Sequence, residues 1–434
     1  MRPDSTSSAL RAALLACAAL AVFSAACGGR EASDSEQPWT VTVDSTGDTI
    51  RVHIAGTVPP SYVHSLVPEL RVGSLDGGEE ETFGQIEAVF GLGDGGLLVY
   101  DGQAQALRMF DSTGAFVRRV GGKGGGPGEH GHVNGIARLP GGRWALWDAQ
   151  GARVNFYGPD GSFERNMSLQ LSGWFLQDGL RAGRAGDLYA WSVLETSATE
   201  FRILRAGYVR VDADGAASDT LEMPKWGIPE AVLSARSADG GSASASQVPW
   251  FPSSQVTFDP AGGLISAPGA PDYVWYRLIA AAKPLRVDVD YEPVPVGATE
   301  RAERRAQIEH TMRRLNPSWN WTGPAIPDVK PAVRDLAAGE DGRIWVRLYT
   351  PEEPIPEAEL PVIPAGANPR PRRTTREPDL WDVFAPDGRL LGRVRPPPGT
   401  SLLSFSGNHV WASMRDSLDV PYAVRLRIEP ALPR

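Results

Sequence analysis

Two stretches of the sequence, GDGGLLVYDGQAQALRMFDSTGAFVRRV (93–120) and PGGRWALWDAQGARVNFYGPDGSFERNM (140–167), align with each other when their turns are matched. The glycine of the second turn, Gly114 and then Gly161, recurs after 47 residues, and Asp101 and Asp148 are separated by the same interval. A period of this size is typical of the blades of a β-propeller. Weaker copies continue to the C-terminal end, and six units can be counted.

Each unit has the composition of four short strands. An apolar strand such as IEAVFGL (86–92) is followed by a Gly-rich turn, a strand rich in Trp or Val, an alternating strand, a D-x-x-G turn and a final strand such as FVRRV (116–120). β-branched and aromatic residues favour strands, whereas Asp and Gly favour turns. A single four-stranded sheet would expose an apolar face and an edge, so such units stack around an axis. The sequence therefore predicts an all-β, six-bladed β-propeller over residues 39–430.

The last unit lacks a final strand, and a segment near the N-terminus can supply it. LVPELRVGS (66–74) resembles the end of a final strand, because Val72-Gly73 matches Val120-Gly121. We expect this segment to close the last blade, which would remove the free edges of the ring. The hairpin pattern WTVTVDSTGDTIRVHI (39–54) is expected to lie beside this closure.

Residues 1–26 have the features of a signal peptide, since Arg2 and Arg11 precede an apolar run that is too short to span a bilayer and ends in small residues. The tail SAAC, ending at Cys27, resembles a bacterial lipobox, although Ser24 stands where an aliphatic residue is usual. LLAC, ending at Cys17, fits that position better but leaves a very short apolar run. We favour acylation of Cys27, with 27–38 as a flexible tether. The alternative is an ordinary cleaved signal peptide.

The predicted location is the cell envelope, with the lipid as the only membrane contact. Gly28 rather than Asp follows Cys27, which favours the outer membrane, facing the periplasm. The chain carries 52 acidic and 43 basic residues, and only four of the latter are lysines, so we expect no nucleic-acid partner. No cysteine follows Cys27, which excludes disulfides in the folded part.

At this point a family resemblance is visible. FGQIEAV (83–89), GGGPGEH (124–130) and HVWASMRDSLDVPYAVRLRI (409–428) resemble segments of six-bladed β-propeller proteins of bacterial envelopes, relatives of the NHL-repeat propellers. The resemblance covers about residues 39–428. It implies the fold but no activity, because such propellers include binding scaffolds, lyases and hydrolases.

The loop GGKGGGPGEHGH (121–132) does not fit a phosphate-binding loop. Lys123 is followed by Gly where Ser or Thr is required, and an extended pattern follows where a helix is required. We expect a tight connection between two blades. The alternative is a metal site formed by Glu129, His130 and His132, for which no further ligand is found locally.

The resemblance to gluconolactonase-like propellers implies a calcium site in the central channel as an alternative to no cofactor. The residues expected to face the channel, with oxygen atoms suited to calcium, are Glu87, Asn134, Gln255 and Asp335. No catalytic motif accompanies them, since G-x-S-x-G, H-E-x-x-H and EF-hand patterns do not occur. The catalytic and metal-binding residues therefore stay unassigned.

The long connections should share one face of the ring. They are 121–132, 224–254, 298–315 and 350–378, all of the class that joins second to third strands or one blade to the next. We interpret this face as the working surface, whereas the alternative is that these are tolerated insertions.

One of these connections, 298–315, is expected to be a helix. Its predicted N-cap is Thr299, and a stripe of Ile308, Met312 and Leu315 should pack onto the propeller face as a lid or plug. The alternative is that this helix binds a partner. Trp319 and Trp321 follow and are expected to cap the channel or to stack on a ligand.

Two function classes stay open. The leading hypothesis is a non-catalytic binding or protein-interaction module for an envelope protein or a small ligand, because long loops accompany no catalytic motif. The alternative is a metal-assisted hydrolase or lyase that uses the channel.

Overall fold

The computed structural model describes residues 38–169, 171, 179–196, 203–212, 214–227, 231–360 and 370–433 of the 434-residue chain. The predicted signal peptide, Cys27 and the tether as far as Gln37 lie outside these described residues.

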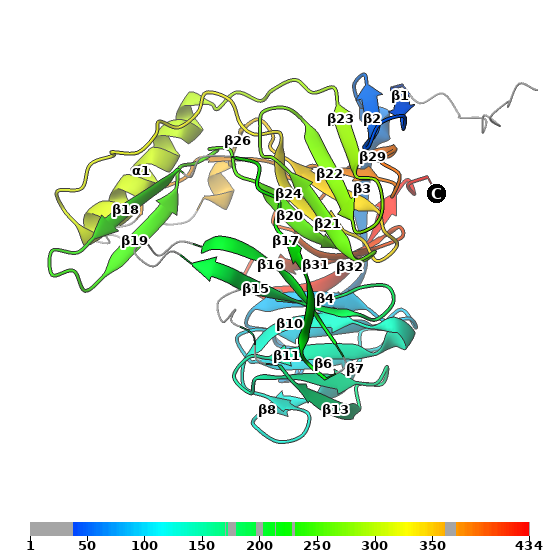
Figure 1. Ribbon diagram of the computed structural model, residues 1–434. Coiled ribbons are helices and arrows are strands. Elements are labelled where there is room, and N and C mark those ends of the chain that lie inside the picture. Colours follow the sequence, from blue (N-terminus) through cyan, green and yellow to red (C-terminus); the bar gives the residue numbers. More distant parts are fainter. Residues whose placement is uncertain are drawn as a thin grey trace, which may run out of the picture. The chain divides into compact units, whose positions relative to one another are not determined.

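The described chain is a six-bladed β-propeller, as predicted, with four antiparallel strands in each blade. Figure 1 shows these strands coloured along the sequence. Blade 1 contains β4 (Ile86–Gly91), β5 (Leu97–Asp101), β6 (Ala106–Phe110) and β7 (Phe116–Val120), and blade 2 contains β10 (Val133–Arg138), β11 (Trp144–Asp148), β12 (Arg153–Tyr157) and β13 (Phe163–Ser168). Blade 3 contains β14 (Leu180–Ala182), β15 (Leu188–Thr196), β16 (Ile203–Val211) and β17 (Ala217–Glu222), and blade 4 contains β20 (Gln255–Asp259), β21 (Gly263–Ala267), β22 (Val274–Ile279) and β23 (Leu285–Val289). Blade 5 contains β24 (Val333–Ala338), β25 (Ile344–Leu348), β28 (Trp381–Phe384) and β29 (Leu390–Arg395), and blade 6 contains β30 (Ser401–Ser406), β31 (His409–Arg415), β32 (Pro421–Glu429) and the N-terminal β3 (Val63–Val72).

The closure of the ring by an N-terminal strand is confirmed. β3 pairs antiparallel with β32, with Val72 opposite Ala423. Glu69 of β3 reinforces this pairing, because its carboxylate lies 2.7 Å from Arg427 Nε and 3.2 Å from both Arg425 Nε and His409 Nε2. Both ends of the propeller are thereby held in one blade.

The hairpin of β1 (Thr40–Asp44) and β2 (Ile50–Ala55) lies elsewhere than expected. β2 pairs in parallel with β23 and so extends the outer edge of blade 4 rather than the closing blade. Val52 and Ile54, which alternate along β2, are buried in the core shared by blades 4 and 5. Their apolar side chains account for this placement, because both are removed from water there.

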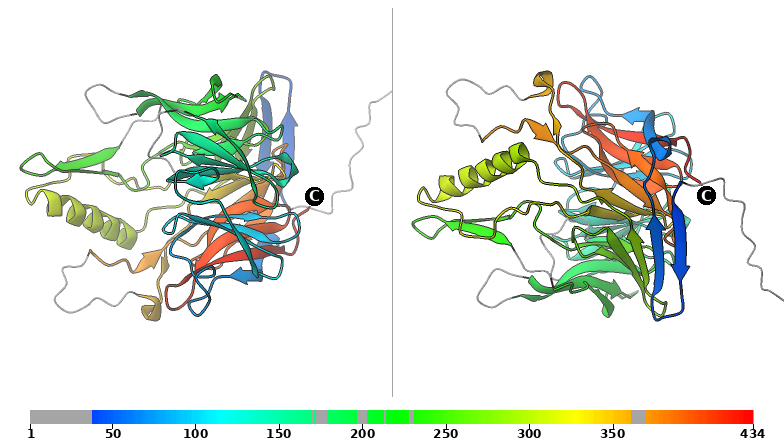
Figure 2. Two further views of the ribbon diagram at one scale, coloured as in Figure 1. Left: turned by 90° about the horizontal axis from the view of Figure 1, so that it is seen from below. Right: turned by 90° about the horizontal axis from the view of Figure 1, so that it is seen from above.

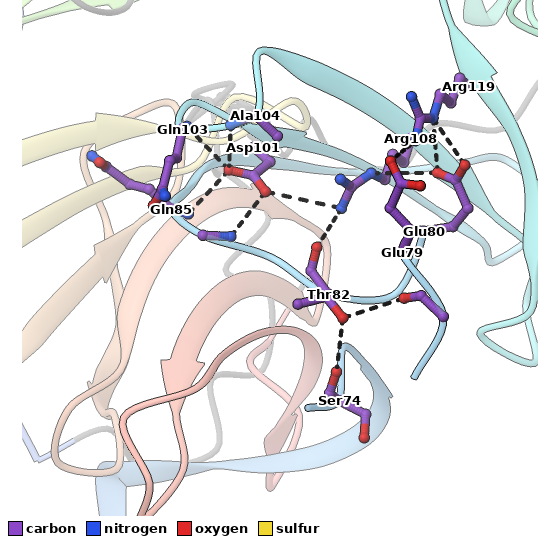
Figure 3. A network of polar contacts seen from close by, with 12 residues as sticks. Ser74, Glu79, Glu80, Thr82, Gln85, Asp101, Gln103, Ala104, Arg108 and Arg119 are labelled. Atoms are coloured by element: carbon purple, nitrogen blue, oxygen red, sulfur yellow. Dashed lines mark hydrogen bonds and ion pairs between the residues drawn. The ribbon is translucent and has the colours of Figure 1, made fainter. Parts of the chain in front are cut away.

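The repeat detected in the sequence extends to side-chain contacts. Asp101 ends the second strand of blade 1 and Asp148 ends that of blade 2, and both are buried. Each carboxylate accepts backbone N–H groups from the loops on either side, from Gly84, Gln85, Gln103 and Ala104 in blade 1 and from Gly131, His132 and Gly151 in blade 2. The recurring aspartates are therefore loop anchors, as Figure 3 shows for Asp101.

A second recurring contact ties the third strand to the loop before the first. Arg108 Nη1 donates to the carbonyl of Thr82 at 2.8 Å (Figure 3), and Asn155 Nδ2 donates to that of Glu129 at 2.9 Å. Both donors and both acceptors are separated by the 47-residue period, since 155 − 108 and 129 − 82 are equal. The two blades thus fix their entry loops in the same way despite different side chains.

The D-x-x-G turns account for the glycine that recurs at the same place in blades 1 and 2. In blade 1 the Asp111 carboxylate accepts the N–H groups of Thr113 and Ala115 at 2.8 and 3.0 Å. Gly114 has φ of 87° and Gly161 of 78°, a conformation that side-chain-bearing residues rarely adopt.

Candidate functional site

Three of the four long connections leave the ring on one face, which we call the insertion face. Figure 2 shows α1 (Ala298–Leu315), the hairpin of β18 (Val232–Arg236) and β19 (Ala243–Gln247), and the pair β26 (Glu353–Pro354) and β27 (Thr375–Arg376) projecting from the same side. The β18–β19 hairpin lies in the connection between blades 3 and 4, α1 in that between blades 4 and 5, and the β26–β27 pair in that between β25 and β28. The turns on the opposite face, such as 111–115 and 158–162, are short.

Two of these insertions pack into a core of their own, which we call the insertion platform: α1, β18, β19 and residues 248–251 and 319–326. The stripe on α1 is buried, since Met312 is fully buried, but it packs against the β18–β19 hairpin and not against the propeller face, where it was expected. The N-cap is Gly297 rather than Thr299, because Glu300 accepts the Gly297 N–H at 2.9 Å.

The two tryptophans after α1 belong to this platform. Trp319 is 8% exposed and its indole N–H donates to the carbonyl of Ser234 at 2.8 Å. Trp321 is partly exposed, packs edge-on against Trp319 and lies under Arg305, whose Cζ is 5.1 Å from the ring centroid. Trp319 is therefore a packing residue, and Trp321 presents the more accessible aromatic surface.

Across the described ranges, no helix is long and apolar enough to cross a membrane.

A buried cluster of charges joins the platform to blade 5. Lys330 is fully buried, and its Nζ lies 2.8 Å from carboxylate oxygens of both Glu300 on α1 and Glu377 before β28. It also donates to the carbonyl of Thr350 at 2.9 Å. A buried ammonium requires such partners, since desolvation is costly. Lys330 thus connects two insertions, the one that contains α1 and the one between β25 and β28, at one point.

Below the insertion face, the innermost strands enclose a channel cavity of about 800 Å³. Its walls are mainly apolar and come from all six blades. The innermost strand of blade 3, β14, has only three residues, so Trp191 and Tyr208 of the next two strands reach the cavity and form an aromatic wall. A cavity of this size and composition is typical of small-molecule sites.

The two ends of the cavity differ in charge. Glu87 and Asp335 lie near the first residues of β4 and β24, at the insertion end, whereas Arg138 and Glu340 lie at the opposite end and pair at 2.7 Å. The Asp335 side chain is reached by water inside the channel, yet surrounding protein atoms displace much of its hydration. This desolvation raises the pKa of Asp335 above its ordinary value.

Two other residues predicted to face the channel, Asn134 and Gln255, are not part of the cavity wall. Asn134 is 3% exposed and packs against Gly179 between blades 2 and 3. Gln255 turns toward Ser253, to whose carbonyl its Nε2 donates at 3.2 Å. The structure therefore brings Glu87 and Asp335 to the same cavity and places Asn134 and Gln255 outside its lining.

The Gly-rich loop is a connection between blades 1 and 2, with short strands β8 (Gly122–Lys123) and β9 (Glu129–His130). His130 is buried and its Nε2 donates to the Gln105 carbonyl at 3.0 Å; burial lowers the pKa of this imidazole. Glu129 accepts the Gly126 N–H, while Lys123 and His132 are exposed. In the part of the chain that the structure describes, no three His, Cys, Asp or Glu residues gather as metal ligands.

Sequence reasoning missed the charged residues of the insertion face. Lys330 lies in an apolar segment, AIPDVKPAV (325–333), which was the only signal of a buried lysine. Its partners Glu300 and Glu377 are 30 and 47 residues away, at spacings that no motif describes.

Comparison with known families agrees with the fold. A family model described as a 6-bladed beta-propeller, DUF5128, matches residues 63–215. No curated protein matches the sequence of this chain.

Solved structures with a similar fold have low sequence identity to this protein. A Bacteroides fragilis protein described as an exported protein is 14% identical to this chain in sequence. The match covers 86% of this chain and 98% of that chain, at a TM-score of 0.45. Virginiamycin B lyase from Staphylococcus aureus shares 11%, with coverage of 82% and 98% and a TM-score of 0.36. A gluconolactonase from Xanthomonas campestris shares 12%, with coverage of 87% and 99% and a TM-score of 0.35. Likenesses at these scores carry no information on activity.

Proposed function

We propose that the protein is an exported, lipid-anchored β-propeller that acts as a non-catalytic binding module in the cell envelope. Its working surface is the insertion face, and its ligand is a partner protein or a small molecule. The anchor is acylated Cys27, and the flexible tether over 27–38 allows the propeller to lie at a distance from the membrane surface.

The observation that carries this proposal is the construction of the insertion platform. Tolerated insertions need not contact one another, because lengthening a surface loop costs only about 0.6 kcal/mol per doubling. Here α1 and the β18–β19 hairpin share one core, and Lys330 joins α1 to the segment before β28. A rigid scaffold carrying ordered loops on one face is a usual architecture for recognition.

Export and anchoring predict a simple localisation result. Cys27→Ala should move the protein from the membrane fraction to the soluble fraction, because the acyl chains provide the only membrane contact. Fractionation with immunodetection measures this. Cys17→Ala is the matched control and should leave the distribution unchanged. Retention of the Cys27 variant in membranes would count against the lipid anchor.

The face assignment predicts where ligands crosslink. A photo-reactive amino acid at Thr322, exposed beside Trp321 on the platform, should give a discrete adduct in cells. The same group at Ser112, exposed in a turn of the opposite face, should give none. Mass analysis of the adducts makes the comparison. Equal adducts from both positions, or none from Thr322, would place the working surface elsewhere.

A second candidate function, a metal-assisted hydrolase or lyase, is favoured by the raised pKa of Asp335 beside the channel end that also holds Glu87. A carboxyl group with a raised pKa is suited to proton transfer. Elemental analysis of the purified protein separates the two candidates, since stoichiometric calcium or zinc would favour the enzyme.

A further inference from the structure

Arg304 on α1 is a half-buried cation without a partner. Its guanidinium has five N–H donors, yet it makes no hydrogen bond or ion pair with any residue in the described ranges. Its Cζ lies 6.0 Å from the centroid of the Trp250 ring. Burial lowers the pKa of Arg304, and the neighbouring charge of Arg373 acts in the same direction. A desolvated guanidinium left without an acceptor is unfavourable, and an anionic group would relieve that cost.

Two carboxylates that act on Arg304, those of Glu300 and Glu377, are already engaged by Lys330. Glu300 and Glu377 each lie 2.8 Å from its Nζ, and Glu377 Oε1 also accepts the indole N–H of Trp250 at 3.2 Å. Lys330 lies 5.4 Å from the same Trp250 ring that Arg304 approaches, so the two cations flank one indole.

The cations Lys330, Arg304 and Arg334 lie near two buried carboxylates, Glu300 and Glu377, and the Glu352 carboxylate accepts the backbone N–H of Glu300 at 3.0 Å. Arg347 and Asp379, which lie beside them, form an ion pair and cancel each other. Arg304 and Arg334 therefore have guanidinium N–H donors that no carboxylate of the described chain engages at hydrogen-bonding distance.

Arg334 and Tyr349 add further donors near Arg304, because Tyr349 packs against the same core as Trp250, the ring that Arg304 approaches. Arg334 Nη1 is 3.8 Å from Glu377 and 3.9 Å from Asp379, beyond hydrogen-bonding distance, and its Cζ lies 5.6 Å from the centroid of the Tyr349 ring. The Tyr349 hydroxyl donates to no residue of the described chain. Burial raises the pKa of Tyr349, so the hydroxyl keeps its proton as a hydrogen-bond donor at neutral pH.

We propose that Arg304, Arg334 and Tyr349 bind an oxyanion, a carboxylate or phosphate group of the ligand that docks on the insertion face. This inference rests on the proposed binding function and gives the chemical class of the ligand. Guanidinium groups match the geometry of both oxyanions and form charge-assisted hydrogen bonds with them, and a phenol contributes one more donor.

The test is calorimetric titration of the purified full-length protein with inorganic phosphate and, separately, with succinate, in chloride buffer at constant ionic strength. The wild-type protein should bind at least one of them, and the stronger of the two identifies phosphate or carboxylate as the preferred group. Arg304→Gln should weaken that binding at least tenfold, since it removes a charged donor. Arg314→Gln, an exposed arginine on the same helix, is the matched control and should bind as the wild type does.

Tyr349→Phe is a second variant that keeps the ring and removes only the donor, so it tests the site if Arg304→Gln does not fold. It should weaken binding by a factor of about 3 to 10. The inference is overturned if neither anion binds, if Arg304→Gln binds as tightly as the wild type, or if Arg314→Gln loses as much. Crosslinking from Thr322 with no anion binding would reject the oxyanion site but not the proposed binding function. Anion binding without crosslinking would support the oxyanion site and count against the proposed binding function.

Discussion

Replacing Asp382 by alanine should lower the free energy of unfolding by about 3–5 kcal/mol, the loss expected when one partner of a buried ion pair is removed. Asp382 is fully buried in β28, and its carboxylate accepts hydrogen bonds from Arg393 Nε at 2.6 Å and Nη2 at 3.0 Å. It also accepts from the hydroxyl of Tyr273 at 3.1 Å, which precedes β22 of blade 4. The substitution would leave the Arg393 guanidinium without its carboxylate and would cut a link between neighbouring blades.

Chemical denaturation followed by far-ultraviolet circular dichroism measures this loss. The matched control is Asp387→Ala in the next turn of the same blade, where the carboxylate pairs with Arg389 and both side chains are more than half exposed. Exposed pairs contribute about 0–1 kcal/mol, so the control should change stability little. A loss from Asp382→Ala no larger than that of the control would show that the inter-blade contact is not a main source of stability.

The fold was predictable because its signals are local and repeated. Asp101 and Asp148 anchor equivalent loops, and Gly114 and Gly161 occupy equivalent turns with positive φ, so the period in the sequence is the period of the structure. The closing strand was visible for the same reason, since Val72-Gly73 repeats a pattern found elsewhere. The β1–β2 hairpin was misplaced because it repeats nothing, and its parallel pairing with β23 depends on a distant core.

The channel residues were harder to predict because the innermost strands are irregular. The register shifts at Glu87, at Asn134 and at Arg334, where a bulge places an extra residue opposite the second strand. A bulge breaks the alternation that assigns side chains to one face or the other. Thus Asp335 reaches the cavity, whereas Asn134 is buried between blades although it stands 47 residues after Glu87.

The insertion platform leads to the second large effect. Lys330→Met should destabilise the docking of α1 by about 3–5 kcal/mol, because the carboxylates of Glu300 and Glu377 would stay buried without the cation that lies 2.8 Å from each. The ring has its own blade-to-blade cores, so it should keep its cooperative unfolding while the platform opens. Hydrogen exchange of 298–315, compared with that of β5 and β11, measures the two parts separately.

Two further variants decide whether uncompensated charge is the cause. Adding Glu300→Gln and Glu377→Gln to Lys330→Met removes both negative charges and should restore a large part of the lost protection, because neutral groups cost less to bury than unpaired charged ones. Lys123→Met, at an exposed position in the loop between blades 1 and 2, should leave the exchange of 298–315 unchanged. If the triple variant exchanges as fast as Lys330→Met alone, uncompensated charge is not the cause, and the loss follows from the hydrogen bond that Lys330 Nζ donates to the carbonyl of Thr350 at 2.9 Å.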